Sequence, residues 1–286
     1  MAGVDKPGRL TALSRQFYRR AMDRATREVH REDLARSAIV FSPHPDDETL
    51  GCGGTIIKKI RAGADVTIVF MTDGHQSHAH VIPSHEFKSI RTSEALAASR
   101  VLGVGESRVV FLEFKDGELS MNRDVAIPQV VEMLQRQRPD QVFIPYRGET
   151  PPDHVATNRI VVSALRRWGG AVTVYEYPIW FWRQWPWVSV PLAVRRETFA
   201  TLKSSIVAGL GLRLLWDFRC SVCVEDVLEL KRVALNQHES QMTRLIPDSD
   251  WATLDDVWNG EFLLCLFQDR EIFHRYGLLG EKEGTY

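Results

Sequence analysis

Cysteine and net charge are both scarce in this sequence. Four cysteines in 286 residues are too few for a disulfide framework. We therefore expect reduced thiols and a cytoplasmic setting. The formal charge of -1 argues against nucleic acid as the main partner, because phosphate binding leaves a basic footprint on a protein. The balance of 44% hydrophobic and 26% charged residues is that of a globular protein.

Long apolar runs are also missing. No apolar segment follows the initial methionine, so we expect no signal peptide. The longest apolar stretch, residues 206–218, is interrupted by Arg213 and Asp217 and is too short to span a bilayer. No repeat or low-complexity linker divides the chain. This continuity predicts a single domain over residues 1–286.

The N-terminal segment, residues 1–37, is more basic than the rest. It holds nine Lys and Arg residues against five Asp and Glu residues. Apolar side chains recur there at helical spacing, namely Leu10, Leu13, Phe17, Ala21 and Ala25. We expect a helical extension that packs on the domain through these side chains. The basic charge supports a second interpretation, a helix attracted to the inner, acidic face of a membrane.

From residue 38 onward, short apolar runs alternate with segments of helical periodicity. The sequence predicts five strands, at residues 38–42, 65–74, 108–114, 139–146 and 171–177. It predicts helices between them, at residues 48–64, 87–102, 125–137 and 154–168. Continuously apolar strands that alternate with helices are typical of a parallel sheet covered on both faces. We therefore expect an α/β fold, with a Rossmann-like core over residues 38–178.

Polar clusters follow four of the predicted strands. The first strand ends at "SPHPDDE", the second at "MTDGH", the third near "FKDGE" and the fourth at "PYRGETPPDH". In such sheets, ligands bind beyond the carboxyl ends of the strands. The convergence of these clusters indicates one functional site at this edge of the sheet.

The pattern loosens in residues 179–286, which we expect to add elements that complete this site. A helix is expected at residues 225–238, and a strand with buried thiols at residues 220–223. Four tryptophans lie within eight residues, namely Trp180, Trp182, Trp185 and Trp187. Three interpretations of this cluster stay open: core packing, stacking on a sugar, and seating at a membrane interface.

The first polar cluster has the side chains of a metal site. His44 and Asp47 are three residues apart, and Pro45 favours an extended His44, so a turn after Asp46 can bring both to one ion. Asp46 then points into the cavity, where a general base for a metal-activated water would lie. A catalytic zinc needs a third protein ligand, which we assign to His154. The sequence therefore predicts one zinc ion per chain.

Two alternatives explain less of this cluster. A helix start with acids in its first turn would account for Asp46, Asp47 and Glu48. It would not account for His44, or for a second acid–histidine pair at another strand end. An acidic magnesium pocket, like that of phosphorylated receiver domains, would not account for the histidines, because magnesium prefers oxygen ligands.

The motifs, taken in order, resemble those of a known family. "SPHPDDETLGCGGTI" resembles the opening signature of the PIG-L/LmbE-like deacetylases, which are zinc-dependent N-acetylglucosaminyl deacetylases. The resemblance continues through "VFMTDG", "RTSEALAASRVLGV", "FLEFKDGEL", "PDQVFIP", "PDHVAT" and "LKRVALNQHESQ", over about residues 38–241. It implies a Rossmann-like fold, in agreement with the strand pattern. It also implies zinc ligands at His44, Asp47 and His154, and a catalytic base at Asp46.

The resemblance further implies that Arg91 contacts the substrate and that Asp116 contacts its sugar. The implied reaction removes the acetyl group from an N-acetylated amino sugar in a glycan, glycolipid or glycoconjugate. A lipid-linked substrate would suit a peripheral membrane contact. The alternative is a sugar-binding relative that has lost its activity. Asp46 argues against that alternative, because binding alone needs no base.

One position departs from the family pattern. Many members have a histidine that helps to stabilise the oxyanion where this chain has Pro151, and proline has neither charge nor donor. We favour zinc alone in that role. Otherwise a histidine from elsewhere replaces the donor, and the candidates are His75, His78, His80, His85 and His238. We expect the four histidines of residues 75–85 to cover the cleft rather than to bind a second metal, because acidic ligands are missing there.

Overall fold

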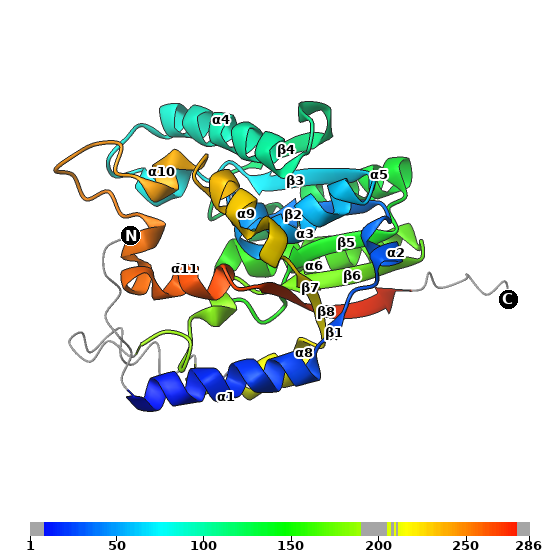
Figure 1. The fold of residues 1–286 in the computed structure, drawn as a ribbon. Coiled ribbons are helices and arrows are strands. Elements are labelled where there is room, and N and C mark those ends of the chain that lie inside the picture. Colours follow the sequence, from blue (N-terminus) through cyan, green and yellow to red (C-terminus); the bar gives the residue numbers. More distant parts are fainter. Residues whose placement is uncertain (1–8, 190–204, 207–208, 210, 279–286) are drawn as a thin grey trace, which may run out of the picture.

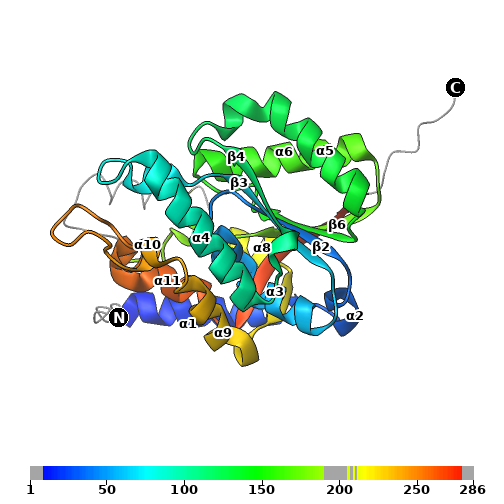
Figure 2. The same cartoon turned by 90° about the horizontal axis from the view of Figure 1, so that it is seen from above.

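The computed structural model describes residues 9–189, 205–206, 209 and 211–278. Helices cover both faces of an eight-stranded sheet (Figures 1 and 2). The five predicted strands form its parallel core: β2 (Ala38–Ser42), β3 (Val66–Thr72), β4 (Val109–Phe114), β5 (Gln141–Pro145) and β6 (Val172–Tyr177). The α/β, Rossmann-like prediction is confirmed.

The strand order creates a crevice between β2 and β5. Across the sheet the order is β1-β7-β8-β6-β5-β2-β3-β4. The chain therefore runs outward from β2 through β3 to β4 and then returns to β5 and β6 on the other side of β2. At such a reversal, consecutive crossovers leave the sheet on opposite faces, so their strand ends diverge and a ligand can enter. The segments after β2 and β5 are the ones with "HPDDE" and "PPDH".

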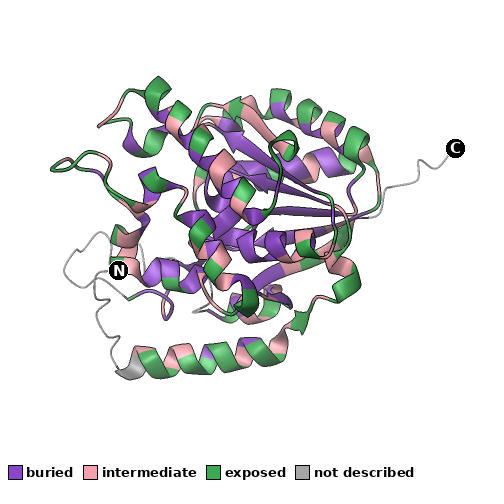
Figure 3. Cartoon of the chain, turned by 45° about the horizontal axis from the view of Figure 1, so that its top comes forward, coloured by how far each residue is buried: buried purple, intermediate pink, exposed green. Residues whose placement is uncertain are grey.

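Two apolar layers hold the helices on the sheet. On one face, α5 (Arg123–Gln137) and α6 (Pro152–Trp168) pack on strand residues such as Ile39 and Val142. On the other face, α3 (Asp47–Arg61), α4 (Ser84–Leu102) and α9 (Leu228–Leu235) pack on residues such as Val40 and Ile68. Figure 2 shows the two layers, and Figure 3 shows the strands buried between them. Alternate side chains of each strand thus serve opposite layers.

Shorter elements complete the description. They are β1 (Arg27–Glu28), α2 (Arg31–Leu34), η1 (His75–His78), η2 (Glu106–Arg108), η3 (Leu119–Asn122), η4 (Trp180–Trp182), α8 (Leu212–Asp217), η5 (Glu225–Val227), α10 (Glu239–Met242), η6 (Leu254–Gly260) and α11 (Glu261–Leu266). Within the described residues, no helix is long and apolar enough to cross a membrane.

The C-terminal part extends the sheet further than its sequence pattern indicated. The strand expected at residues 220–223 is present as β7 (Cys220–Cys223). It pairs antiparallel with β8 (Arg270–Leu278), which in turn pairs antiparallel with β6. The strand β8 was not predicted from the sequence. The helix expected at residues 225–238 is shorter, because it begins with the 3₁₀ turn η5 and ends at Leu235.

The N-terminal helix α1 (Arg9–Ala25) packs on the domain, but the predicted contact face is wrong. Tyr18 and Met22 are buried, and Arg15 donates to the carbonyl of Pro186 at 2.6 Å and to Glu261 at 2.7 Å. By contrast, Leu13 and Phe17 of the predicted face are 65% and 66% exposed. Helical spacing identifies an apolar face, but it cannot choose between the predicted face and another that includes Tyr18 and Met22. The side chain of Leu10 lies outside the description.

Helix α3 is broken near its start, and a carboxylate from β8 fills the break. Cys52 has φ -149°, which interrupts the helical bonding. The amides of Gly54 and Thr55 donate to Glu271 at 2.9 and 2.7 Å, and the buried ammonium of Lys231 pairs with the same carboxylate at 2.7 Å. A methyl group at Gly54 would lie 2.6 Å from Val224. The glycines of "GCGGT" therefore allow β7, β8 and the break to meet.

We predict that Glu271→Gln lowers the free energy of unfolding by about 3–5 kcal/mol, because Lys231 would stay buried without its counter-charge. Denaturant unfolding measures the difference. Glu229→Gln is the matched control, since Glu229 is exposed and lies 4.0 Å from Arg232. This control should lower the free energy of unfolding by at most about 1 kcal/mol. Similar losses in both variants would contradict a structural role for the Glu271 carboxylate.

Candidate active site

Three predicted ligands meet at the crevice between β2 and β5. His44 lies in the turn after β2, Asp47 opens α3, and His154 lies in the first turn of α6. The Oδ2 atom of Asp47 is 3.1 Å from Nδ1 of His44 and 3.2 Å from Nε2 of His154. One donor atom from each residue lies within 4.8 Å of the other two. Two imidazoles and one carboxylate thus face a common point.

The environment of this point suits a cation. The His154 side chain is fully buried, and neither ring nitrogen has a hydrogen-bond partner. Burial lowers the pKa of His44, but hydrogen bonds to Asp116, Asp153 and Asp47 outweigh it and raise the pKa well above its usual value. Burial disfavours an ionised Asp47, but the two imidazoles, His154 above all, lower its pKa overall. Positive charge is therefore favoured here, and a divalent metal would supply it.

Carboxylates lie behind both histidines. Nε2 of His44 is 3.3 Å from Asp116 and 3.4 Å from Asp153. Nδ1 of His154 is 3.6 Å from Glu149. Such carboxylates fix the tautomer and the orientation of a metal-ligating imidazole. Asp116, which the family resemblance associates with the sugar, thus contacts His44 directly.

Sequence reasoning missed Glu149 and Asp153. Asp153 is buried and accepts from the amides of Gly117 and Leu119 at 2.7 and 3.3 Å. Glu149 accepts from three consecutive amides, those of residues 179–181, at 2.8 to 3.1 Å. Their position beside His154 in "GETPPDH" is the sequence feature that could have identified both as site residues. Each carboxylate also ties a separate chain segment to the site.

Asp46 takes a different direction from Asp47 because its backbone is unusual. Its φ is 138°, a region that L-residues rarely adopt. The amide of Asp46 donates to the buried Glu48 carboxylate at 2.9 Å, and Nε2 of His238 lies 3.1 Å from that carboxylate. Burial raises the pKa of Asp46 to about 6, although the Arg91 guanidinium opposes the shift. Asp46 therefore lines the cavity beside the three converging residues as an acid that can change protonation near neutral pH.

The cavity has a volume of about 430 Å³ and combines polar and apolar walls. Arg91 is 2% exposed, donates to the carbonyl of Pro45, and has two nitrogens, Nε and Nη1, without a partner. The apolar wall comes largely from outside the Rossmann-like core. Its residues include Leu50, Trp180, Leu254 and Val257.

Of the histidines considered as donors, only His78 lines this cavity. Its Nε2 donates to the carbonyl of Ala252 at 2.8 Å, its Nδ1 is 3.0 Å from Oγ of Ser77, and the ring stacks on Trp251. Both ring nitrogens are therefore engaged. His238 is buried against Glu48 and does not line the cavity.

The remaining three loop histidines also lie off the cavity. Nδ1 of His75 is 2.7 Å from Asp73, and His80 donates to the carbonyl of Asp250 at 3.0 Å. His85 is exposed. Among the described residues, no metal-type cluster includes any of the four histidines of residues 75–85.

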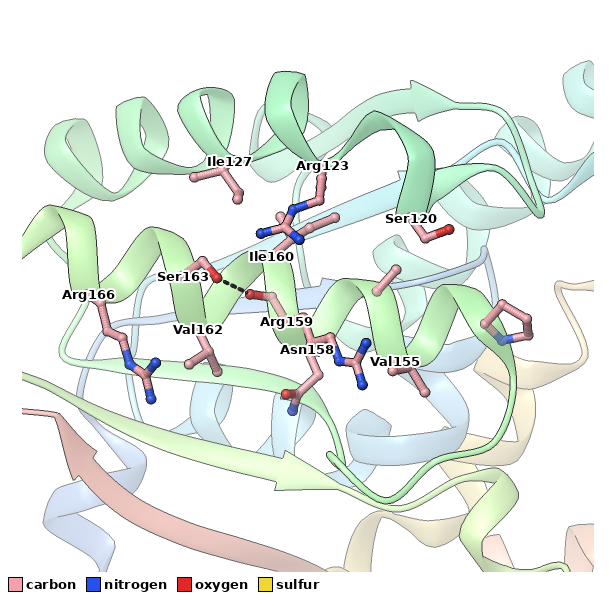
Figure 4. A pocket seen from close by; sticks show the side chains of 12 residues that line it. Ser120, Arg123, Ile127, Val155, Asn158, Arg159, Ile160, Val162, Ser163 and Arg166 are labelled. Atoms are coloured by element: carbon pink, nitrogen blue, oxygen red, sulfur yellow. Dashed lines mark hydrogen bonds between the residues drawn. The ribbon is translucent and has the colours of Figure 1, made fainter.

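A second hollow, of about 530 Å³, lies between α5 and α6 and shares no lining residue with the first. Figure 4 shows Arg123 reaching from α5 toward α6, and Arg159 and Arg166 of α6 line the same groove. None of the residues that carry the chemistry described above lies in it.

Comparisons with known proteins agree with this geometry. The family model described as PIG-L, GlcNAc-PI de-N-acetylase, matches residues 39–165. A protein of Bacillus cereus named "Probable N-acetyl-alpha-D-glucosaminyl L-malate deacetylase 2" is 31% identical, over 79% of this chain and 98% of its own length. The diacetylchitobiose deacetylase of Thermococcus kodakarensis is 26% identical, over 84% of this chain and 80% of its own length.

Solved structures share the fold. The N,N'-diacetylchitobiose deacetylase of Pyrococcus horikoshii has a TM-score of 0.61 at 20% identity, with 95% of this chain and 94% of that chain covered. The hydratase GalB of Pseudomonas putida reaches 0.56 at 14% identity, with 88% of this chain and 99% of that chain covered. The fold alone therefore does not specify the reaction. The sequence matches, together with the His–Asp–His cluster, do: this chain belongs to the PIG-L family and is an N-deacetylase.

Proposed function

We propose that this enzyme removes the acetyl group from an N-acetylated amino sugar with the help of one zinc ion held by His44, Asp47 and His154. The observation that carries the proposal is the convergence of their three donor atoms within 4.8 Å. Asp46 and Arg91 line the cavity beside them. The relatives named above as deacetylases of diacetylchitobiose and of N-acetylglucosaminyl malate support an N-acetylglucosamine-type substrate.

The donor set favours zinc over magnesium. Zinc accepts imidazole and carboxylate ligands, and three protein ligands leave one position open for catalysis. Magnesium prefers oxygen ligands. The ring nitrogens of the buried His154 support the same choice: each lies near a carboxylate, Asp47 or Glu149, but makes no hydrogen bond of good geometry, and such a buried polar atom is costly unless a ligand satisfies it.

When bound, the zinc ion supplies Lewis-acid polarisation of the acetyl carbonyl. Asp46 acts as the general base: it takes a proton from the attacking water as the new carbon–oxygen bond forms. It then donates that proton to the amine nitrogen as the carbon–nitrogen bond breaks. Acetate and a free amino sugar are the products. A pKa of about 6 lets one carboxyl group both accept and release a proton near neutral pH.

Arg91 and Asp116 have separate parts in this proposal. Arg91 anchors the substrate: it lines the cavity, and its Nε and Nη1 atoms are buried without a hydrogen-bond partner, so a small shift of the guanidinium would let it donate to a hydroxyl or phosphate oxygen. Asp116 acts mainly through His44. One of its oxygens faces the imidazole, and the other accepts from the amide of Gln76 at 2.9 Å. Because each oxygen keeps a free lone pair and Asp116 lines the cavity, it can still accept from a sugar hydroxyl.

The apolar wall supports a sugar-binding role for one tryptophan of the cluster. Trp180 lines the cavity and stacks on Phe262 with ring centroids 4.7 Å apart. A sugar ring has an apolar face that packs well against such a fixed aromatic plane. Trp182 and Trp187 are buried, which supports core packing for them.

The same observations support a single catalytic domain over residues 1–286, with residues 179–286 completing the site, because Leu254 and Val257 line the cavity. The described cysteines are all free thiols, which supports a cytoplasmic setting.

The alternative to the proposed function is a protein that binds the sugar but has lost its activity. The orientation of Asp46 into the cavity counts against it.

Metal analysis tests the ligand assignment. We expect about one zinc per chain in the purified enzyme, and a loss of most of it in His44→Ala and in His154→Ala, because each substitution removes one of three ligands. His80→Ala is the matched control, since His80 lies outside the metal-type clusters of the described residues. Full zinc content in both ligand variants would refute the assignment.

Acetate release from diacetylchitobiose and other N-acetylated sugars, with and without a chelator, tests the reaction. We expect release that the chelator abolishes. Asp46→Asn should retain zinc and lose about 10²–10⁴ in kcat, because a general base is removed but no ligand is. Sugar binding without acetate release by the wild-type enzyme would favour the inactive alternative. Loss of zinc in Asp46→Asn would make Asp46 a ligand.

The oxyanion role at Pro151 has its own test. Because both ring nitrogens of His78 are engaged, we expect His78→Ala to leave kcat within a few-fold of wild type. Pro151→His should raise kcat or leave it unchanged. Loss of an oxyanion donor typically costs about 10²–10³ in kcat. A drop of that size in His78→Ala, with zinc content intact, would identify His78 as the replacement donor.

A further inference from the structure

Exposed apolar side chains gather on α1 and α8. Of the ten large hydrophobic side chains that are exposed within the described ranges, five belong to these helices or to the residues just before α8. They are Leu13, Phe17, Ile206, Leu212 and Trp216. Trp216, at 69% exposure, is the largest of them. Isolated exposed apolar residues are ordinary, but a group on two adjacent helices marks an interaction surface.

The two helices are in direct contact. They pack side by side at the bottom of Figure 1, and the ring of Tyr18 in α1 lies against Gly211 at the start of α8. Leu214 is buried on the inner side of α8, so Leu212 and Trp216, one turn apart, lie on its outer side. We call the exposed side of both helices the α1–α8 face, defined by Leu13, Phe17, Arg20, Arg24, Leu212 and Trp216.

Basic charge lies among the apolar side chains. Arg20 and Arg24 are exposed and share a side of α1 with Leu13 and Phe17, opposite the buried Tyr18. Within the described part of the chain, neither arginine has an ion-pair partner. The outer side of α1 is visibly exposed along its length in Figure 3. The α1–α8 face thus combines apolar side chains, one tryptophan and unpaired guanidinium groups.

The charge and the apolar side chains of the α1–α8 face favour one kind of partner over another. A symmetric dimer through this face would place two patches of the same basic charge against each other, and like charges at an interface are unfavourable. An anionic bilayer offers phosphate groups to the arginines and an apolar layer just beneath them. Interfacial helices have this pattern, and tryptophan prefers the boundary between headgroups and acyl chains.

We propose that the α1–α8 face docks the enzyme on an anionic lipid bilayer as a peripheral contact. Phe17, Leu13 and Trp216 enter the headgroup boundary, and Arg20 and Arg24 bind lipid phosphates. The attachment is weak and reversible and is sensitive to ionic strength, because its electrostatic part is screened by salt. It does not depend on the reaction proposed above, so either proposal can fail without the other.

Co-sedimentation of the full-length enzyme with vesicles tests the docking. We expect binding to vesicles of phosphatidylcholine mixed with phosphatidylglycerol, weaker binding at high salt, and little binding to phosphatidylcholine alone. Arg20→Gln/Arg24→Gln should weaken binding about 10- to 30-fold. The matched control is Arg159→Gln/Arg166→Gln, which removes two exposed arginines from the α5–α6 groove and should leave binding unchanged.

A second pair of variants tests the apolar side chains of the α1–α8 face. Leu13→Gln/Phe17→Gln should weaken binding about tenfold or more. Met121→Gln/Val125→Gln removes comparable exposed apolar surface elsewhere and should leave binding unchanged. Circular dichroism and acetate release check that each variant is folded, which we expect since all the replaced side chains are exposed.

A depth measurement locates the contact independently. Brominated phosphatidylcholine in the anionic vesicles should quench tryptophan fluorescence in the wild-type enzyme, and Trp216→Phe should lose most of that quenching. The proposal is overturned if the wild type does not bind anionic vesicles, or if the α1 variants bind as tightly as it does. It is also overturned if the α5–α6 control loses as much affinity. A dimer in lipid-free solution that Leu13→Gln/Phe17→Gln dissociates would assign the face to self-association instead.

Discussion

The Glu271 carboxylate inside the break of α3 is the contact on which the geometry of the site depends. A continuous helix from Asp47 would satisfy its own amides and would fix its first turn in line with the rest. Here Gly54 and Thr55 donate to Glu271 instead, and Lys231 neutralises the charge. The first turn can therefore tilt toward the crevice between β2 and β5, while the remainder of α3 stays packed on the sheet.

A second buried network gives two adjacent aspartates, Asp46 and Asp47, different orientations. The φ of 138° at Asp46 is strained, and such conformations persist only where the surroundings enforce them. Glu48 holds the Asp46 amide, and His238, also fully buried, holds Glu48. With the backbone turned in this way, Asp46 lines the cavity and Asp47 faces the two imidazoles. His238 thus contributes to the site through Glu48, without contacting the cavity itself.

Much of the core was predictable, because its strands are continuously apolar and alternate with helices. The strand β8 was not, since charged residues such as Arg270, Glu271 and Arg275 interrupt its sequence and its burial depends on partners. The network of Glu48 and His238 joins residues 190 positions apart, and no local pattern indicates such a pairing. The family motifs could bring His44, Asp47 and His154 together, but they could not reveal which carboxylates lie behind the imidazoles. Those contacts arise only when the loops after β4, β5 and β6 are folded against each other.

The chemistry and the shape of the site come from different parts of the chain. The residues assigned to metal binding, proton transfer and substrate anchoring all lie within residues 39–165, the range that the family model matches. The apolar wall of the cavity comes mainly from Trp180, Leu254 and Val257, outside that range. Hydrolysis of an N-acetyl group needs only the first set. On the function proposed above, the rest of the substrate would contact the second set, so the C-terminal elements would contribute to the choice of substrate. Because those elements also pack against α1 through Glu261 and Arg15, the shape of the cavity is linked to the same helix that carries the exposed basic face.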